Sequence, residues 1–214
     1  MKTDELVEML ARGAEPVPRH AAGNRLLAVV ALGMPLTVVL VAVSFGIRHD
    51  LGRALGEPLF WIKFGVPLAV AIAAGLSLRR LTSPGVPAGP AWRLGAFTVL
   101  ALWVLAALQW TGLSEAARAE ALWGSTWRVC SMSIAAVSLP LLVSMLTLLR
   151  GLAAPTRPAL AGAAAGLLSG GLGTIAYALH CPEPGLAFVA VWYVLGVAIV
   201  SGVGAALGRR MFRW

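Results

Sequence analysis

Long apolar stretches alternate with short polar segments along the whole chain. A helix needs about 20 mostly apolar residues to cross the hydrocarbon core of a bilayer, which is about 30 Å thick. In lipid a helix pairs its backbone groups internally, and these stretches are too long and too little alternating for the strands of a β-barrel. The pattern therefore predicts an all-α, polytopic membrane protein with six transmembrane helices, at residues 26–47, 59–78, 94–113, 129–149, 159–179 and 186–207.

Two polar segments flank the predicted bundle of residues 26–207: an N-terminal tail, residues 1–25, and a basic C-terminus, residues 208–214. Lys and Arg collect in the short cytoplasmic loops of membrane proteins. The side that holds both chain ends carries twelve of the 17 Lys and Arg residues, so we expect both termini in the cytoplasm. Lys63 lies just inside the second stretch and is expected to extend its amine to the interface, with a buried functional lysine as the less favoured interpretation.

Composition agrees with a membrane protein, because 59% of the residues are hydrophobic and only 12% are charged, against about 25% charged in soluble domains. The net charge of +8 would suggest nucleic-acid binding in a soluble protein. Here the basic residues lie between apolar stretches and are explained by orientation, so no direct nucleic-acid binding is expected. The first 25 residues contain four acidic residues and lack the apolar core of a signal peptide, so the tail is expected to remain.

The tail contains a short amphipathic segment. Thr3 or Asp4 can cap a helix that runs to Arg12, and acidic residues in its first turn favour the helix dipole. A helix of about ten residues is unstable alone in water, so this one needs a partner protein or a membrane surface. Its hydrophobic residues are Leu6, Val7, Met9 and Leu10.

The fifth apolar stretch carries Gly162, Gly166 and Gly170 at four-residue spacing, which places them on one face of a helix. Ridges of small residues let helix backbones approach closely. Because a six-helix bundle has many internal interfaces, we expect this ridge to pack within the chain. A homo-oligomer is not required.

Motifs of enzymes are absent from the sequence, which contains no HExxH, no CxxC and no phosphate-binding glycine loop between a strand and a helix. Lys63 is the only charged residue within the six stretches. Ion and proton pathways usually require acidic residues or His inside the bundle. Neither an enzyme nor a cofactor is therefore expected, and a transporter is disfavoured except for an apolar substrate.

The two cysteines are the remaining candidates for chemistry. Cys130 lies one residue into the fourth stretch and Cys181 two residues past the fifth, so a rise of about 1.5 Å per residue places both thiols at similar heights on the extracytoplasmic side. Oxidation is possible there, so the pair can be a redox switch or a permanent disulfide. The remaining interpretation is that the two cysteines are unpaired and pack as small hydrophobic residues. The sequence does not fix helix rotation and hence the distance between the Cα atoms. Cys130, His180 and Cys181 also form a candidate set of metal ligands.

Several short sequences in this order resemble the NrsF family, membrane-bound anti-sigma factors named as negative regulators of sigma F. The resemblance covers nearly the whole chain. It rests on MKTDEL at 1–6, FWIK at 60–63, WRVC at 127–130, SI at 133–134, APTRPALAG at 154–162, AYALHCPE at 176–183, WY at 192–193 and LGRR at 207–210.

The resemblance implies a six-helix protein of the bacterial inner membrane, surrounded by membrane lipids, whose cytoplasmic N-terminal segment sequesters an extracytoplasmic-function sigma factor. The sigma-binding residues would be Asp4, Leu6, Val7, Met9 and Leu10. It also implies that Cys130 and Cys181, near the periplasmic face, sense redox or heavy-metal stress and so cause release.

From the residues alone, two other classes remain open. One is a membrane thiol oxidoreductase, against which the absence of CxxC argues. The other is a small-solute transporter, which would explain six helices without the tail.

Overall fold

The computed structural model describes residues 3–12, 21–83, 85–152 and 155–212, which are helical apart from short connections. Six long apolar helices in these residues confirm the predicted all-α membrane fold. They are α2 (Ala21–Ser44), α4 (Pro58–Leu81), α5 (Ala91–Thr111), α7 (Trp127–Leu152), α8 (Pro158–Ala178), and a last helix built of α9 (Leu186–Phe188), a π-helical turn (Val189–Tyr193) and α10 (Val194–Met211). Three short helices complete the described chain: α1 (Thr3–Arg12), α3 (Leu51–Ala54) and α6 (Glu115–Trp123).

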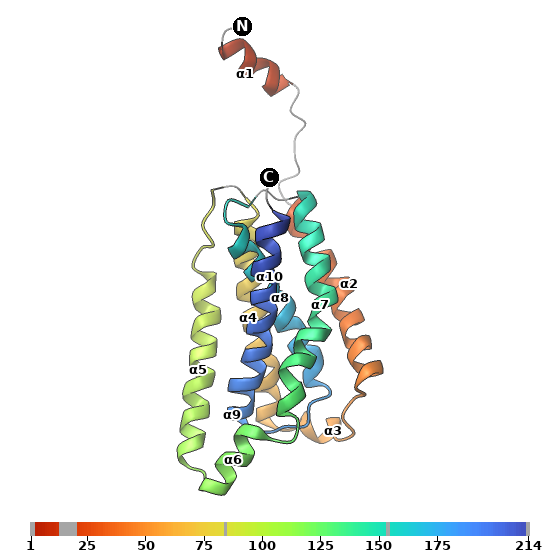
Figure 1. Ribbon diagram of the computed structural model, residues 1–214, viewed down its shortest axis with the longest axis vertical. Helices are drawn as coiled ribbons and strands as arrows, with labels where there is room; N and C mark the ends of the chain where they lie inside the picture. Colours follow the sequence, from red (N-terminus) through yellow and green to blue (C-terminus); the bar gives the residue numbers. More distant parts are fainter. Residues whose placement is uncertain (1–2, 13–20, 84, 153–154, 213–214) are drawn as a thin grey trace.

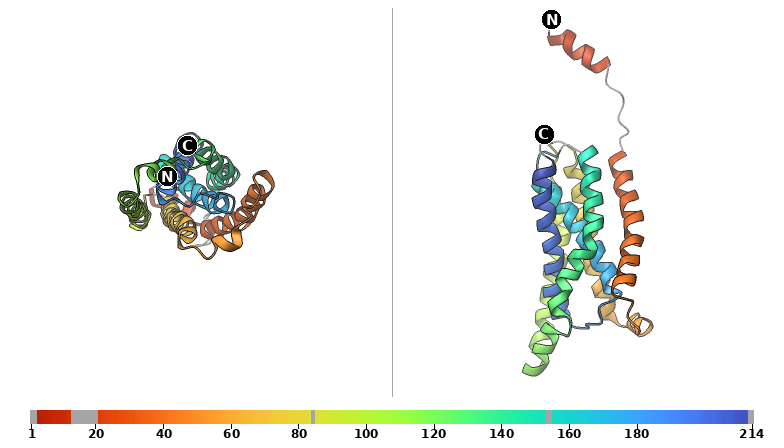
Figure 2. Two further views of the ribbon diagram at one scale, coloured as in Figure 1. Left: turned by 90° about the horizontal axis from the view of Figure 1, so that it is seen from below. Right: turned by 45° about the vertical axis from the view of Figure 1, so that its right-hand side comes forward.

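Helix α8 lies at the centre of the bundle, where it contacts α2, α4, α7 and α10 (Figure 2). Its sequence consists largely of Ala and Gly, and such small side chains allow neighbours to pack closely on several sides at once. Helices α2 and α5 lie at the periphery and leave most of their side chains exposed, as lipid-facing helices do.

The glycine ridge of α8 faces α10. A Cβ atom at Gly162 would overlap with the carbonyl oxygen of Gly204, and a Cβ atom at Gly166 would lie only 2.6 Å from the Cα atom of Ser201. A Cβ atom at Gly170 would lie 3.3 Å from the Cα atom of Val197. The structure therefore uses the ridge for packing between two helices of the same chain.

The start of α2 and the end of α10 lie at the same end of the bundle, as six crossings require (Figure 1). Helices α3 and α6 and the connection 179–185 lie at the opposite end. Helix α1 lies apart from the bundle, beyond the end at which α2 begins. Residues 1–2 and 13–20 of the predicted tail, and residues 213–214 of the predicted C-terminus, are outside the described residues.

Candidate functional site

The two cysteines lie side by side in one apolar cluster at the α3 and α6 end of the bundle. Cys130 is in the first turn of α7, where its amide donates to the carbonyl of Thr126 over 3.0 Å. Cys181 follows α8, and its amide donates to the carbonyl of Tyr177 over 3.1 Å. Both residues are free thiols with no exposed surface. A turn of helix and a helix end thus bring together the two residues that the sequence singled out.

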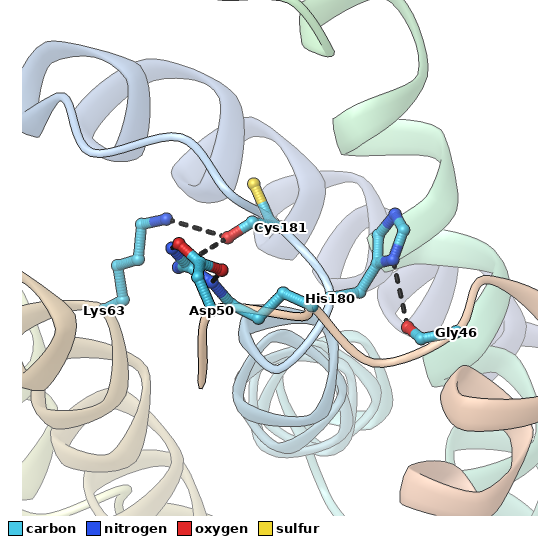
Figure 3. Close-up of polar contacts among 6 residues, drawn as sticks. Gly46, Asp50, Lys63, His180 and Cys181 are labelled. Carbon is cyan, nitrogen blue, oxygen red and sulfur yellow. Dashed lines mark hydrogen bonds and ion pairs between the residues drawn. The ribbon is translucent and has the colours of Figure 1, made fainter. Parts of the chain in front are cut away.

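Two cations converge on the backbone carbonyl of Cys181 (Figure 3). The Nζ atom of Lys63 donates to this oxygen over 3.2 Å, and a guanidinium nitrogen of Arg48 over 3.3 Å. Lys63 is only 2% exposed, so the expectation that it extends to the interface is wrong. The reason is that the carbonyls past the end of α8 lack partners within the helix, and the Lys63 amine donates a hydrogen bond to one of them. The same amine lies 5.8 Å from the centre of the Tyr193 ring, which also attracts a cation.

Arg48 also ties the connection between α2 and α3 to the end of α8. Its amide donates to the carbonyl of Leu179 over 3.1 Å, and its guanidinium forms a two-point ion pair of 2.6 Å with Asp50. The hydrogen bonds of this pair raise the pKa of Arg48 and lower the pKa of Asp50 to about 2, because each partner stabilises the charged form of the other. The cation next to Cys181 is therefore held in one geometry.

Glu183 connects the Cys181 segment to the start of the helix that carries Cys130. Its carboxylate accepts hydrogen bonds from the amide and hydroxyl of Ser125, at 2.8 and 2.6 Å, and from the amide and hydroxyl of Thr126, both at 3.2 Å. Burial acts to raise the pKa of Glu183, but these hydrogen bonds outweigh it and the pKa lies below its ordinary value. The carboxylate thus binds the two residues that immediately precede α7, at a helix N-terminus where a negative charge is favoured by the helix dipole.

His180 is the neighbour of Cys181 in the sequence, but its side chain makes different contacts. Its Nδ1 atom is 3.1 Å from the carbonyl oxygen of Gly46, and its ring packs on Phe45 and Tyr177. Figure 3 shows the imidazole and the Cys181 thiol pointing in different directions. Among the described residues, no group of three or more His, Cys, Asp or Glu side chains is placed to hold a metal ion. The expected ligand set of Cys130, His180 and Cys181 is therefore not assembled in this structure.

The sequence matches the family described as "Negative regulator of sigma F", NrsF, over residues 10–214. The chain belongs to the NrsF family. It is 38% identical over 214 residues to "Probable anti-sigma-F factor NrsF" of Azospira oryzae and 40% identical over 219 residues to "Anti-sigma-F factor NrsF" of Caulobacter vibrioides. Each match covers 100% of both chains. No solved structure matches the chain.

In this NrsF chain the surroundings of Cys181 favour its thiolate. The pKa of Cys181 is lowered to about 6, first by a hydrogen bond with the Cys130 thiol and further by the positive charge of Lys63, while burial opposes both. A thiolate is the form of cysteine that attacks disulfides and other electrophiles. The arrangement therefore supplies one nucleophilic sulfur and a second thiol beside it.

The N-terminal candidates lie far from this thiol pair. Asp4, Val7 and Met9 are exposed on α1, with Val7 60% and Met9 57% exposed. The side chains of Leu6 and Leu10 lie outside the described part of the chain. Helix α1 thus presents exposed apolar residues, at the end of the molecule opposite the thiols.

Sequence reasoning placed Cys130 and Cys181 at one height but did not find the residues that fix them. Neither Arg48 nor Glu183 was predicted to fix the cysteines, because charged residues are common in loops. Lys63 could have been found from the sequence, since it is the only charged residue in the six apolar stretches. Tyr193 was also missed, although its buried side chain lies in the same apolar cluster as both cysteines.

Proposed function

We propose that this chain is a membrane-embedded anti-sigma factor that binds an extracytoplasmic-function sigma factor through α1 and releases it when the cysteine pair reacts. The observation that carries the proposal is full-length identity of 38–40% to two proteins named anti-sigma-F factors. The geometry adds a reactive thiol pair and a separate amphipathic helix, which are the two parts that a stress-responsive anti-sigma factor needs.

The proposed sigma-binding element is α1, with Asp4, Leu6, Val7, Met9 and Leu10 as its contact residues. An amphipathic helix can place its apolar face in a groove of a partner protein, which would also supply the stability that a helix of ten residues lacks in water. The exposed Val7 and Met9 side chains support this assignment. Asp4 and Glu5 in the first turn favour the helix dipole.

The proposed sensor is the pair Cys130 and Cys181. A thiol oxidant that carries a disulfide takes two electrons and two protons from the pair, which forms one S–S bond while the oxidant becomes two thiols. The thiolate of Cys181 makes the first attack, and Cys130 resolves the mixed disulfide. A soft heavy-metal ion bridged by the two sulfurs is the other proposed stimulus, without a contribution from His180.

Either reaction replaces the hydrogen bond between the thiols with covalent or coordinate bonds. The segment 179–185 is fixed to α7 by Glu183 and to α4 by Lys63, so a shift at the sulfurs acts on both helices. Sigma is released only if its affinity differs between the two states of the bundle, since an effector shifts populations through differential binding.

The decisive experiment is co-purification of a sigma factor with the full-length protein from membranes, with and without a thiol oxidant. We expect sigma to be retained by the untreated protein and lost on oxidation, whereas Cys130→Ser and Cys181→Ser proteins retain it under both conditions. Deletion of residues 3–10 should abolish retention without oxidant. Retention by the deletion variant refutes the role of α1, and oxidant-induced release from the serine variants refutes the sensor.

A further inference from the structure

An apolar groove of about 750 Å³ opens between α4, α5 and α8. Helix α5 packs on α4 and, at its far end, on α9 and the π-helical turn, which leaves the groove along its inner face. The walls are formed by small or apolar side chains such as Val70, Ala73, Val99, Ala163 and Leu167. This volume is within the range of sites that hold drug-sized molecules, and the groove lies within membrane-spanning helices.

The groove is polar only toward the end at which α4 ends and α8 begins. There Ser77 is 5% exposed, and its hydroxyl oxygen has no hydrogen-bond partner among the described residues. A buried hydroxyl without a partner is costly and requires an explanation. Ser77 lines the groove, so a ligand in the groove would supply the missing hydrogen bond.

Arg157 lines the same end of the groove and is exposed, with Trp92 close by on the wall formed by α5. No acidic residue lines the groove within the described chain. A Trp at this position is typical of the depth of lipid head groups, and a cation at the mouth of a groove between helices favours an anionic head group. The charge is therefore complementary to phosphate.

A smaller cavity of about 120 Å³, lined mostly by apolar residues, shares Val70, Val99 and Leu167 with the groove. The apolar surface thus extends from the cationic mouth toward the middle of the bundle. Such a shape, with one polar end and a long apolar body, is that of an amphiphile.

We propose that the groove between α4, α5 and α8 is a binding site for one anionic phospholipid, whose phosphate lies at Arg157, whose ester group bonds to Ser77, and whose acyl chain fills the apolar walls. The lipid fills the space between α5 and α8 and so supports α5 against the bundle. This site is independent of the sigma-binding and sensing functions proposed above.

The test uses the full-length protein in nanodiscs of phosphatidylcholine or of phosphatidylcholine with phosphatidylglycerol, followed by native mass spectrometry of the protein with its retained lipids. We expect one phosphatidylglycerol to be retained in preference to phosphatidylcholine. Arg157→Gln should reduce that preference about fivefold, since one cation near a membrane surface contributes about that factor. Arg150→Gln is the matched control, because Arg150 is exposed at the end of α7 and does not line the groove.

Ala163→Phe fills the groove while keeping the apolar character of its wall, and should remove the retained lipid from a protein that still elutes as a single species. The control is Val143→Phe on the exposed face of α7. Equal retention of the two lipids by the unaltered protein would overturn the proposal. Unchanged retention in Ala163→Phe, or a lipid-free dimer in which a second copy covers α5, would overturn it too.

Discussion

Lys63 shows how a single residue can set the chemistry of the thiol pair. A buried lysine is costly unless its amine finds partners, and in the described part of the chain those partners are the Cys181 carbonyl and the Tyr193 ring rather than a carboxylate. Its charge is therefore left to act on the neighbouring sulfurs. Cys181 gains stabilisation of its thiolate, which is the form that reacts.

We predict that Lys63→Met slows the reaction of Cys181 with a small, membrane-permeant thiol reagent about tenfold at pH 7, because loss of the positive charge raises the thiol pKa. Lys63→Arg keeps the charge and should react at close to the unaltered rate. Arg53→Met, at an exposed position of α3, is the matched control at the same end of the bundle. Equal rates for the Met and Arg variants of Lys63 would contradict the role of its charge.

The pH dependence of the same reaction follows from the pKa of Cys181, which is lowered to about 6. Because the thiolate forms as pH rises through the pKa, the rate should fall about tenfold from pH 7 to pH 5. Replacing Cys130 with Ala removes the hydrogen bond that is the largest cause of the lowered pKa, so the midpoint of the rate profile should move upward. A midpoint that stays in place would show that Cys130 does not act on Cys181.

At the scale of residues, the sequence predicts the height of Cys130 and Cys181 but not their surroundings. Height follows from helix length, which is read from the apolar stretches. Burial of Lys63 depends on the rotation of α4 and on the free carbonyl past the end of α8, which no local pattern encodes. His180 illustrates the same limit, since its neighbour in sequence points another way.

At the scale of elements, the close approach of α8 and α10 is the clearest constraint. We predict that Gly166→Leu destabilises the bundle by about 2–3 kcal/mol, because the new side chain has no room beside Val200 and Ser201. Gly202→Leu on α10 is the matched control, since a Cβ atom there meets nothing within 4 Å. Thermal unfolding in detergent should show a lower midpoint for Gly166→Leu alone, and equal midpoints would refute the packing argument.

Glu183, at the N-terminus of α7, leads to a second prediction at this scale. Glu183→Gln should cost about 1 kcal/mol, because a neutral amide is a weaker acceptor than a carboxylate near a helix N-terminus, while Glu120→Gln on the exposed face of α6 should be near neutral. The folded-state pKa of Glu183 is lowered, so its contribution is present above the ordinary pKa of about 4.3 and is lost as pH falls through the lower value. Denaturation curves at pH 7 and at pH 3 should therefore differ less for Glu183→Gln than for the unaltered protein.

The element boundaries show which features a sequence can reveal. The six apolar helices and the glycine ridge follow from local pattern. The π-helical turn at Val189–Tyr193 does not, because it depends on tertiary contacts such as the hydrogen bonds of Trp192 to Leu122 and of Ser131 to Trp192. The groove beside α5 likewise reflects how far one helix stands from another.

At the scale of the whole molecule, the thiols and α1 lie at opposite ends of the bundle, so orientation in the membrane decides whether the pair meets oxidants. The excess of Lys and Arg at the α1 end predicts that this end is cytoplasmic. We predict that an impermeant maleimide labels Arg53→Cys in spheroplasts, whereas Ser83→Cys is labelled only after permeabilisation. Both variants are made in a Cys130→Ser, Cys181→Ser background, and both positions are exposed at opposite ends of the bundle. The reverse labelling pattern would place the thiols in the reducing cytosol, where oxidation could not act as their signal. It would also place α1 outside the cytoplasm, where it could not meet a sigma factor.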